Sequence, residues 1–204
     1  MIAALVAAFV AVLVRILCGP TVRYLRDIEG APPRVFFANH SSHLDFVVLW
    51  ATLPAAQRAR THPVAARDYW TRGRVRRFIA GRFFGGLMIE RLNPTSEDNP
   101  VEQMLRVLDG EDSLILFPEG TRGTGEAVAP FRSGLFRIYE SRPDVELIPV
   151  YLENLNRILP KGEFLPVPLL SYVTFGEPLP RKDNETRDDF LERARETLIR
   201  LEAA

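Results

Sequence analysis

The chain has 204 residues, with 26 lysines and arginines against 26 aspartates and glutamates, so its formal net charge is zero. This length suits a single domain with a sizeable core, and the ordinary shares of apolar and charged residues argue against disorder. Its single cysteine, Cys18, excludes an intramolecular disulfide and a cysteine-based zinc cluster.

The N-terminal segment is strongly apolar. An unbroken apolar run covers residues 2–14 and continues to Cys18 after one arginine. A transmembrane helix needs about 20 apolar residues, so this segment could cross a thin bilayer or lie in one leaflet as a monotopic anchor. Three arginines follow the run instead of preceding it, which argues against a secretory signal peptide and favours a cytoplasmic main domain: Arg15, Arg23 and Arg26. We therefore expect a membrane anchor over residues 1–26 and one domain over residues 27–204.

The next part of the chain predicts a strand, a polar loop and a helix. Val35–Ala38 is a short apolar stretch typical of a buried strand, and the longer apolar stretch Leu44–Leu53 predicts a helix. A second helix is predicted to begin after Asn99, with Pro100 at its first position, and to end near Leu108.

Three strands and a last helix are predicted further on. The strands are expected at residues 113–117, 147–151 and 170–175, and the capping pattern of Thr186 and Asp189 begins an amphipathic helix that runs to Leu201. Strands alternating with helices predict a single α/β domain with a mixed central sheet flanked by helices. Ligands in such sheets bind beyond the carboxyl ends of strands, where two polar loops are expected, at Asn39 and Pro118.

The first loop holds two of the three histidines of the chain, and its sequence runs Asn-His-Ser-Ser-His-Leu-Asp over residues 39–45. Histidine accepts a proton near neutral pH, and a carboxylate partner fixes its tautomer. His40 and Asp45 could therefore form such a histidine–carboxylate pair, with His40 as the proton acceptor. The two side chains can meet only if His40 precedes the helix and the loop folds back. Two alternatives are that the residues cap the helix start, or that His43 joins them to bind a metal.

The second loop runs Phe-Pro-Glu-Gly-Thr-Arg-Gly over residues 117–123. Its glycines let the backbone approach an anion closely, and Arg122 offers a forked donor set that matches a phosphate. Glu126 stands where a Walker loop needs lysine, and Val128 stands where a dinucleotide fingerprint needs its third glycine. A solvated turn is the plain alternative.

Arginine is concentrated between these two loops. Residues 58–91 contain nine arginines but only Asp68 and Glu90 as acidic residues. This segment is either a solvated face or a surface for anionic lipid headgroups or phosphorylated ligands.

Taken together, the two loops resemble the signature of the 1-acylglycerol-3-phosphate acyltransferase family of glycerophospholipid acyltransferases. Four blocks match in order over about residues 35 to 176, and they are His40–Asp45, Gly86–Arg91, Phe117–Arg122 and Ile148–Val150. Three departures bear on substrate preference: His43, Gly123, and Arg132 after Phe131.

The resemblance implies a role for each site residue. His40 would be the general base and Asp45 its orienting partner, while Arg91 and the loop residues Glu119, Gly120, Thr121 and Arg122 would bind the acceptor phosphate. The acyl group would pass from acyl-CoA or acyl carrier protein to a lysophospholipid hydroxyl, giving phosphatidic acid from 1-acylglycerol-3-phosphate. Membrane lipids would be partners, and neither a metal, a cofactor nor a nucleic acid is expected.

Two other functions stay open from the sequence. A lipid hydrolase could use the same base to activate water, and a non-catalytic lipid-binding module would need only the apolar N-terminus and the arginines. Neither a Gly-x-Ser-x-Gly elbow nor a cysteine paired with histidine is found, which fits direct transfer without a covalent acyl-enzyme.

Overall fold

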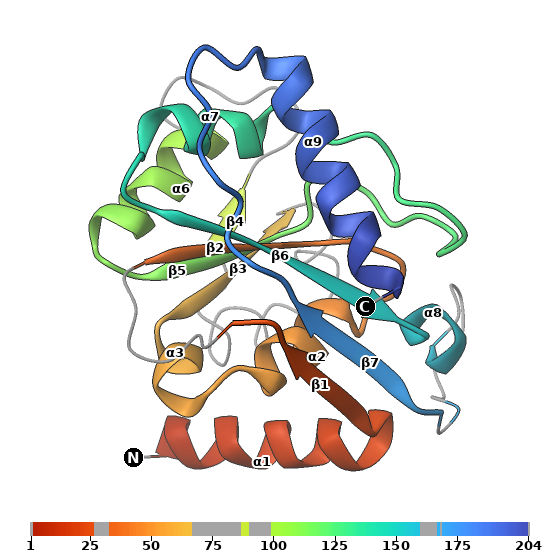
Figure 1. The fold of residues 1–204 in the computed structure, drawn as a ribbon. Helices are drawn as coiled ribbons and strands as arrows, with labels where there is room; N and C mark the ends of the chain where they lie inside the picture. The colour runs from red at the N-terminus through yellow and green to blue at the C-terminus, as the bar shows by residue number, and fades with distance from the viewer. Residues whose placement is uncertain are drawn as a thin grey trace.

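The structure is a computed structural model that describes residues 2–26, 33–66, 87–89, 99–159, 167 and 169–203. A seven-stranded sheet forms its centre, in the order β1-β7-β6-β2-β5-β3-β4 (Figure 1). The strands are β1 (Pro20–Tyr24), β2 (Arg34–Ala38), β3 (Thr61–Ala66), β4 (Leu87–Ile89), β5 (Ser113–Leu116), β6 (Glu146–Glu153) and β7 (Ser171–Phe175). All neighbouring strands run parallel except β6 and β7, so the mixed α/β sheet expected from the sequence is confirmed.

Helices cover both faces of the sheet. They are α1 (Ile2–Cys18), α2 (Asp45–Thr52), α3 (Ala55–Ala59), α6 (Pro100–Asp109), α7 (Gly134–Ser141), α8 (Leu155–Ile158) and α9 (Arg187–Arg200), with a 3₁₀ turn over Leu201–Ala203. In Figure 1, α1 and α2 lie below the sheet, and α6, α7 and α9 lie above it.

Strand β2 shows how the sequence divides the core into two halves. All five of its residues are buried, and successive side chains of a strand point to opposite faces. Phe37 packs with residues of α6, α7 and α9, whereas Phe36 packs with residues of α1 and α2. Full burial of such a side chain contributes about 1.5–3 kcal/mol, so the strand that carries the first polar loop is firmly held.

The helix starts that the sequence predicted are present. The Asn99 side chain accepts a hydrogen bond from Val101 N at the start of α6, with Pro100 as the first helical residue. Thr186 accepts from Asp189 N at the start of α9, as the capping pattern indicated.

The apolar N-terminal segment forms helix α1, and one face of it packs on the domain. Ala11, Val14 and Cys18 are buried in the core half that contains α2. Among the described residues, no helix has the length and apolar character needed to cross a membrane.

The expected division at residue 26 needs one correction. Strand β1 was grouped with the anchor, but it pairs with β7 from Pro20↔Ser171 to Tyr24↔Phe175 and so belongs to the sheet. The sequence signal was weak because this edge strand is largely exposed and opens with a proline, which edge strands tolerate. Whether residues 1–26 act as a membrane anchor stays a prediction.

Candidate active site

Two loops meet at the carboxyl edge of the sheet, as the sequence indicated. Strands β2 and β5 are parallel neighbours with Phe37 opposite Leu116, so the chain leaves both strands at the same end. The loop after β2 carries His40, and the loop after β5 carries Glu119 and Arg122. Segments about 80 residues apart in the chain therefore form one site, at the place where parallel sheets bind ligands.

His40 and Asp45 form the expected pair. His40 Nδ1 lies 2.8 Å from Asp45 Oδ2, and Asp45 is completely buried as the first residue of α2. The loop folds back because the same oxygen accepts hydrogen bonds from Ser41 N at 2.6 Å and Ser42 N at 2.8 Å. A carboxylate at a helix N-terminus also gains from the helix dipole. Asp45 is thus fixed as an acceptor for the imidazole.

The bonding pattern differs from that of a helix cap. The N-cap residue of α2 is Leu44, which makes no side-chain cap bond. The two amides that donate to Asp45 Oδ2 belong to Ser41 and Ser42, which precede the helix. The second carboxylate oxygen, Asp45 Oδ1, is buried without a hydrogen-bond partner among the described residues. The negative charge is therefore directed to His40 and the turn before α2.

The His40 ring is oriented by an aromatic neighbour. It stacks on Phe117 with ring centroids 4.3 Å apart and an interplanar angle of 22°, and 20% of its side chain is exposed. With Nδ1–H donated to Asp45, the other ring nitrogen, Nε2, keeps the lone pair that a general base uses.

The second loop also holds the main chain of His40. Its N–H donates to Glu119 Oε1 at 2.6 Å, and its carbonyl accepts from Gly123 N at 2.8 Å. The other carboxylate oxygen, Glu119 Oε2, accepts from Ala129 N at 2.8 Å. Burial raises the pKa of Glu119 above its ordinary value, although hydrogen bonds from the amides of Ala129 and His40 act in the opposite direction. Glu119 thus fastens the two loops together, and its expected contact with substrate stays a prediction.

Asn39 fixes the other side of the turn that follows β2. Its side-chain amide donates to Leu152 O at 2.8 Å, and its side-chain oxygen accepts from Leu152 N at 2.8 Å. Two bonds to one residue of β6 set where the chain leaves β2. This role could not be derived from the sequence because it depends on the pairing of β2 with β6.

Three of the remaining predicted site residues lie in the second loop, and they are Gly120, Thr121 and Arg122. Gly120 has φ +75°, in the left-handed region that favours glycine, and it turns the chain before the exposed Thr121. The Arg122 guanidinium contacts His43 Nε2. The arginine that is expected to bind the acceptor phosphate therefore lies against the first loop. Arg91 lies outside the described residues.

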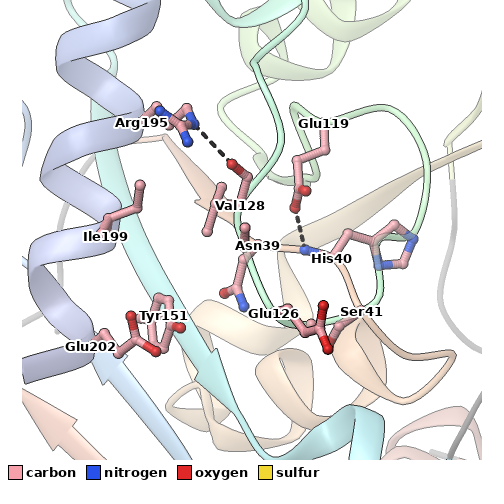
Figure 2. A pocket seen from close by; sticks show the side chains of 12 residues that line it. Asn39, His40, Ser41, Glu119, Glu126, Val128, Tyr151, Arg195, Ile199 and Glu202 are labelled. Atoms are coloured by element: carbon pink, nitrogen blue, oxygen red, sulfur yellow. Dashed lines mark hydrogen bonds between the residues drawn. The ribbon is translucent and has the colours of Figure 1, made fainter.

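A cavity of about 190 Å³ lies between the two loops and helix α9. Figure 2 shows Asn39 and the His40 main chain on one side, Glu119 and Val128 beside them, and Arg195, Ile199 and Glu202 opposite. Burial, followed by the nearby Glu202 carboxylate, raises the pKa of the Tyr151 hydroxyl in this cavity far above its ordinary value. In the described part of the chain, no group of three or more histidine, cysteine or acidic side chains is arranged to hold a metal ion.

Several known proteins are similar to this chain. The family model described as Acyltransferase matches residues 20–153. A chloroplastic 1-acyl-sn-glycerol-3-phosphate acyltransferase of Brassica napus is 24% identical over 152 residues, which cover 68% of this chain and 40% of that protein. The 1-acyl-sn-glycerol-3-phosphate acyltransferase of Haemophilus influenzae is 27% identical over 152 residues, which cover 66% of this chain and 56% of that protein. The chain thus spans about half the length of these relatives.

One solved structure has the same fold. The crystal structure of the 1-acyl-sn-glycerophosphate acyltransferase from Thermotoga maritima aligns with a TM-score of 0.75 and 17% sequence identity, covering 98% of this chain and 78% of that one.

Proposed function

The chain belongs to the acyltransferase family, and we propose that it transfers a fatty acyl group to the free hydroxyl of 1-acylglycerol-3-phosphate, giving phosphatidic acid. The acyl donor is acyl-CoA or acyl carrier protein, and no metal or cofactor takes part. The observation that carries the proposal is the His40 Nδ1 to Asp45 Oδ2 contact of 2.8 Å, with the carboxylate fixed by two backbone amides. The names of the relatives support the choice of acceptor.

The proposed reaction is a direct transfer. The acceptor hydroxyl oxygen attacks the thioester carbonyl carbon while His40 Nε2 takes the hydroxyl proton, and Asp45 stabilises the imidazolium that forms. The carbon–sulfur bond then breaks, and the proton passes to the leaving thiolate to give a free thiol. A positioned base contributes about 10²–10⁴ in rate, so the remainder comes from holding both substrates in line.

The second loop supplies the acceptor site in this proposal. Arg122 lies in the same loop as Glu119, whose carboxylate binds the His40 N–H, so a phosphate on Arg122 would be held at a fixed place relative to the base. A guanidinium suits this task because it binds two phosphate oxygens in a planar fork. The same role is proposed for Arg91, on the sequence resemblance alone.

The experiment follows the products from a radiolabelled acyl thioester. Purified protein is given 1-acylglycerol-3-phosphate, the same lipid without phosphate, or no acceptor. Phosphatidic acid and free thiol in equal amounts with 1-acylglycerol-3-phosphate, and neither product without an acceptor, are the expected result. Free fatty acid without an acceptor would identify a lipid hydrolase instead, and no turnover would identify a non-catalytic lipid-binding protein. Full activity in a chelator is expected, because the proposed step uses no metal.

We further propose that helix α1 lies along a membrane surface. Its buried face packs on the domain, while the opposite face exposes five apolar side chains at helical spacing: Phe9 (66% exposed), Val12 (53%), Leu13 (42%), Ile16 (73%) and Leu17 (41%). A helix with one face committed to the domain presents the other face to lipid in the plane of the interface. That the domain faces the cytoplasm stays a prediction.

Flotation with vesicles of phosphatidylcholine and phosphatidylglycerol tests this surface. The double substitution Phe9→Ser and Ile16→Ser alters only strongly exposed side chains, so the fold and the activity on detergent-dispersed acceptor should be kept while vesicle binding falls. The matched control is Val167→Ser, an exposed apolar residue outside α1. Unchanged vesicle binding by the double variant would show that this face does not attach the protein.

A further inference from the structure

Helix α9 touches the catalytic loops through one arginine that the proposed mechanism does not use. Arg195 Nε donates a hydrogen bond of 2.9 Å to the carbonyl of Val128, at the far end of the loop that begins at Phe117. Its guanidinium also pairs with Glu192 Oε1 at 3.0 Å on the same helix. The side chain is 26% exposed, so Arg195 is partly shielded from water.

A chain of hydrogen bonds connects this contact to the base. Ala129, the residue after Val128, donates its N–H to Glu119 Oε2, and Glu119 Oε1 accepts the His40 N–H. Figure 2 shows both ends of the chain, with Arg195 bonded to Val128 and Glu119 bonded to His40. The position of the His40 main chain thus depends on where Ala129 holds the Glu119 carboxylate.

The cavity beside these hydrogen bonds explains why the bond from Arg195 to Val128 matters for the position of the loop. In a close-packed interior, the loss of one hydrogen bond leaves a segment held by its neighbours. Here about 190 Å³ of space lies between α9 and the loop, with Glu119, Val128 and Arg195 among its lining residues. The loop has room to shift if the bond is removed, and a misplacement of about 1 Å in an active site can cost about 10²-fold in rate.

We propose that Arg195 is a positioning residue of acyl transfer, which holds the Val128–Ala129 segment so that Glu119 fixes the main chain of His40. The proposal rests on the proposed function, because it concerns the base of that reaction. The proposal gives helix α9 a part in positioning the base, although α9 lies outside the two loops that carry the expected site residues.

Two substitutions separate the hydrogen bond from the charge. Arg195→Met keeps most of the side-chain length and removes every donor. Arg195→Gln removes the charge and the pairing with Glu192, yet the glutamine Nε2 is the same number of bonds from Cα as the arginine Nε and can donate to Val128 O. The matched control is Arg200→Met on the same helix, an exposed arginine that pairs only with Glu196 and Thr197 in the described residues.

The measurement is steady-state acyl transfer well below the unfolding temperature of each variant, together with thermal unfolding. Arg195→Met is expected to lower kcat by about 10-fold or more with a smaller change in both KM values, because the base is displaced after the substrates bind. Arg195→Gln should stay within about threefold of the wild-type kcat, and Arg200→Met should match the wild type. A merely structural arginine would lower the unfolding temperature and leave kcat unchanged.

Four outcomes would overturn the proposal. An unchanged kcat in folded Arg195→Met, or an equal loss in Arg195→Met and Arg195→Gln, would refute the role of the Val128 hydrogen bond while leaving acyl transfer itself established. A wild-type protein that transfers no acyl group in the same assay would refute the proposed function and, with it, the role of Arg195. If Arg195→Met does not fold, an Arg195→Gln variant with strongly lowered kcat would refute the positioning role by itself.

Discussion

Two histidine–carboxylate pairs lie at opposite edges of the sheet. His40 Nδ1 lies 2.8 Å from Asp45 Oδ2 beyond the carboxyl end of β2. His62 Nε2 lies 2.9 Å from Asp112 Oδ2 near the amino ends of β3 and β5. The two contacts are almost equal in length, so distance alone does not identify a catalytic pair.

The surroundings of the carboxylates differ. Asp45 is fully buried, and backbone amides fix the oxygen that faces the imidazole. The Asp112 side chain is 35% exposed and is shared with Arg60, whose Nε lies 3.1 Å from Oδ1. A buried carboxylate with one imidazole partner can orient a base. A partly exposed carboxylate that is shared with an arginine forms a surface ion-pair network, which contributes little to stability. The comparison predicts that equivalent substitutions have unequal effects on activity.

The largest expected difference is between the histidines. His40→Ala should lower acyl transfer by about 10²–10⁴ because it removes the base, whereas His62→Ala should keep nearly full activity. Initial rates with a thioester donor measure both variants, with circular dichroism to confirm the fold. Substantial activity in His40→Ala, or an equal loss in the two variants, would remove the distinction between the pairs. The neighbouring His43→Ala should be much milder than His40→Ala.

The carboxylates should differ almost as much. Asp45→Asn keeps an acceptor for His40 Nδ1–H but loses the charge that stabilises the imidazolium, so a fall in kcat of about 10² or more is expected. It also gives the Ser41 and Ser42 amides a neutral acceptor in place of a charged one, which should lower the free energy of unfolding by about 1–3 kcal/mol. Asp112→Asn should change neither quantity strongly. The measurements are kcat and urea unfolding of both variants, and a harmless Asp45→Asn would argue against the proposed role of Asp45.

A smaller effect is expected at the arginines. Arg122→Lys keeps the charge and loses the planar fork, so KM for the phosphorylated acceptor should rise by about 10-fold with little change for the acyl donor. Arg60→Lys is the control, because Arg60 pairs with Asp112 at the other edge of the sheet. It should leave KM for the acceptor and KM for the acyl donor unchanged. The same variants are compared on the dephosphorylated acceptor. An equal loss on both acceptors would refute phosphate recognition by Arg122 without refuting acyl transfer.

The sequence predicted the contact between His40 and Asp45 better than the bonds that surround it. His40 and Asp45 are close in the chain, and a strand, loop and helix pattern brings them together, so local reasoning was sufficient. His62 and Asp112 could not be paired in this way because they meet only when Thr61 aligns with Ser113 across β3 and β5. The bonds of Glu119 to Ala129 and of Arg195 to Val128 likewise depend on tertiary placement.

The fold was predicted to a similar extent. The apolar stretch Leu44–Leu53 corresponds to α2 (Asp45–Thr52), because a continuous apolar segment gives a strong signal. Helix α7 (Gly134–Ser141) was not predicted, although its buried residues Leu135 and Ile138 have helical spacing, since the segment is only eight residues long. The role assigned to Arg91 stays a prediction from the sequence.

The smallest expected effect is on stability at acid pH. Burial acts to raise the pKa of Asp112, but hydrogen bonds and charges from His62 and Arg60 outweigh it and hold the pKa below its ordinary value. The folded protein therefore binds fewer protons here than the unfolded chain, whose aspartate pKa is about 3.9. This contribution is present above the unfolded pKa and is lost as the pH falls through the folded one. Because the group is partly exposed, it should be less than about 1 kcal/mol.

Asp112→Asn tests the sign of this contribution. The variant should be slightly less stable than the wild type at neutral pH, and the difference should shrink as the pH falls below the ordinary aspartate value of about 3.9 and through the lower pKa of the folded protein, where the wild-type carboxylate also becomes neutral. Urea midpoints measured for both proteins across that range give the difference directly. Glu119, whose pKa is raised by burial, contributes with the opposite sign, so only the difference between the two proteins isolates Asp112. A difference that grew as the pH fell would contradict a lowered pKa and would show that the His62–Asp112 pair does not favour the ionised carboxylate.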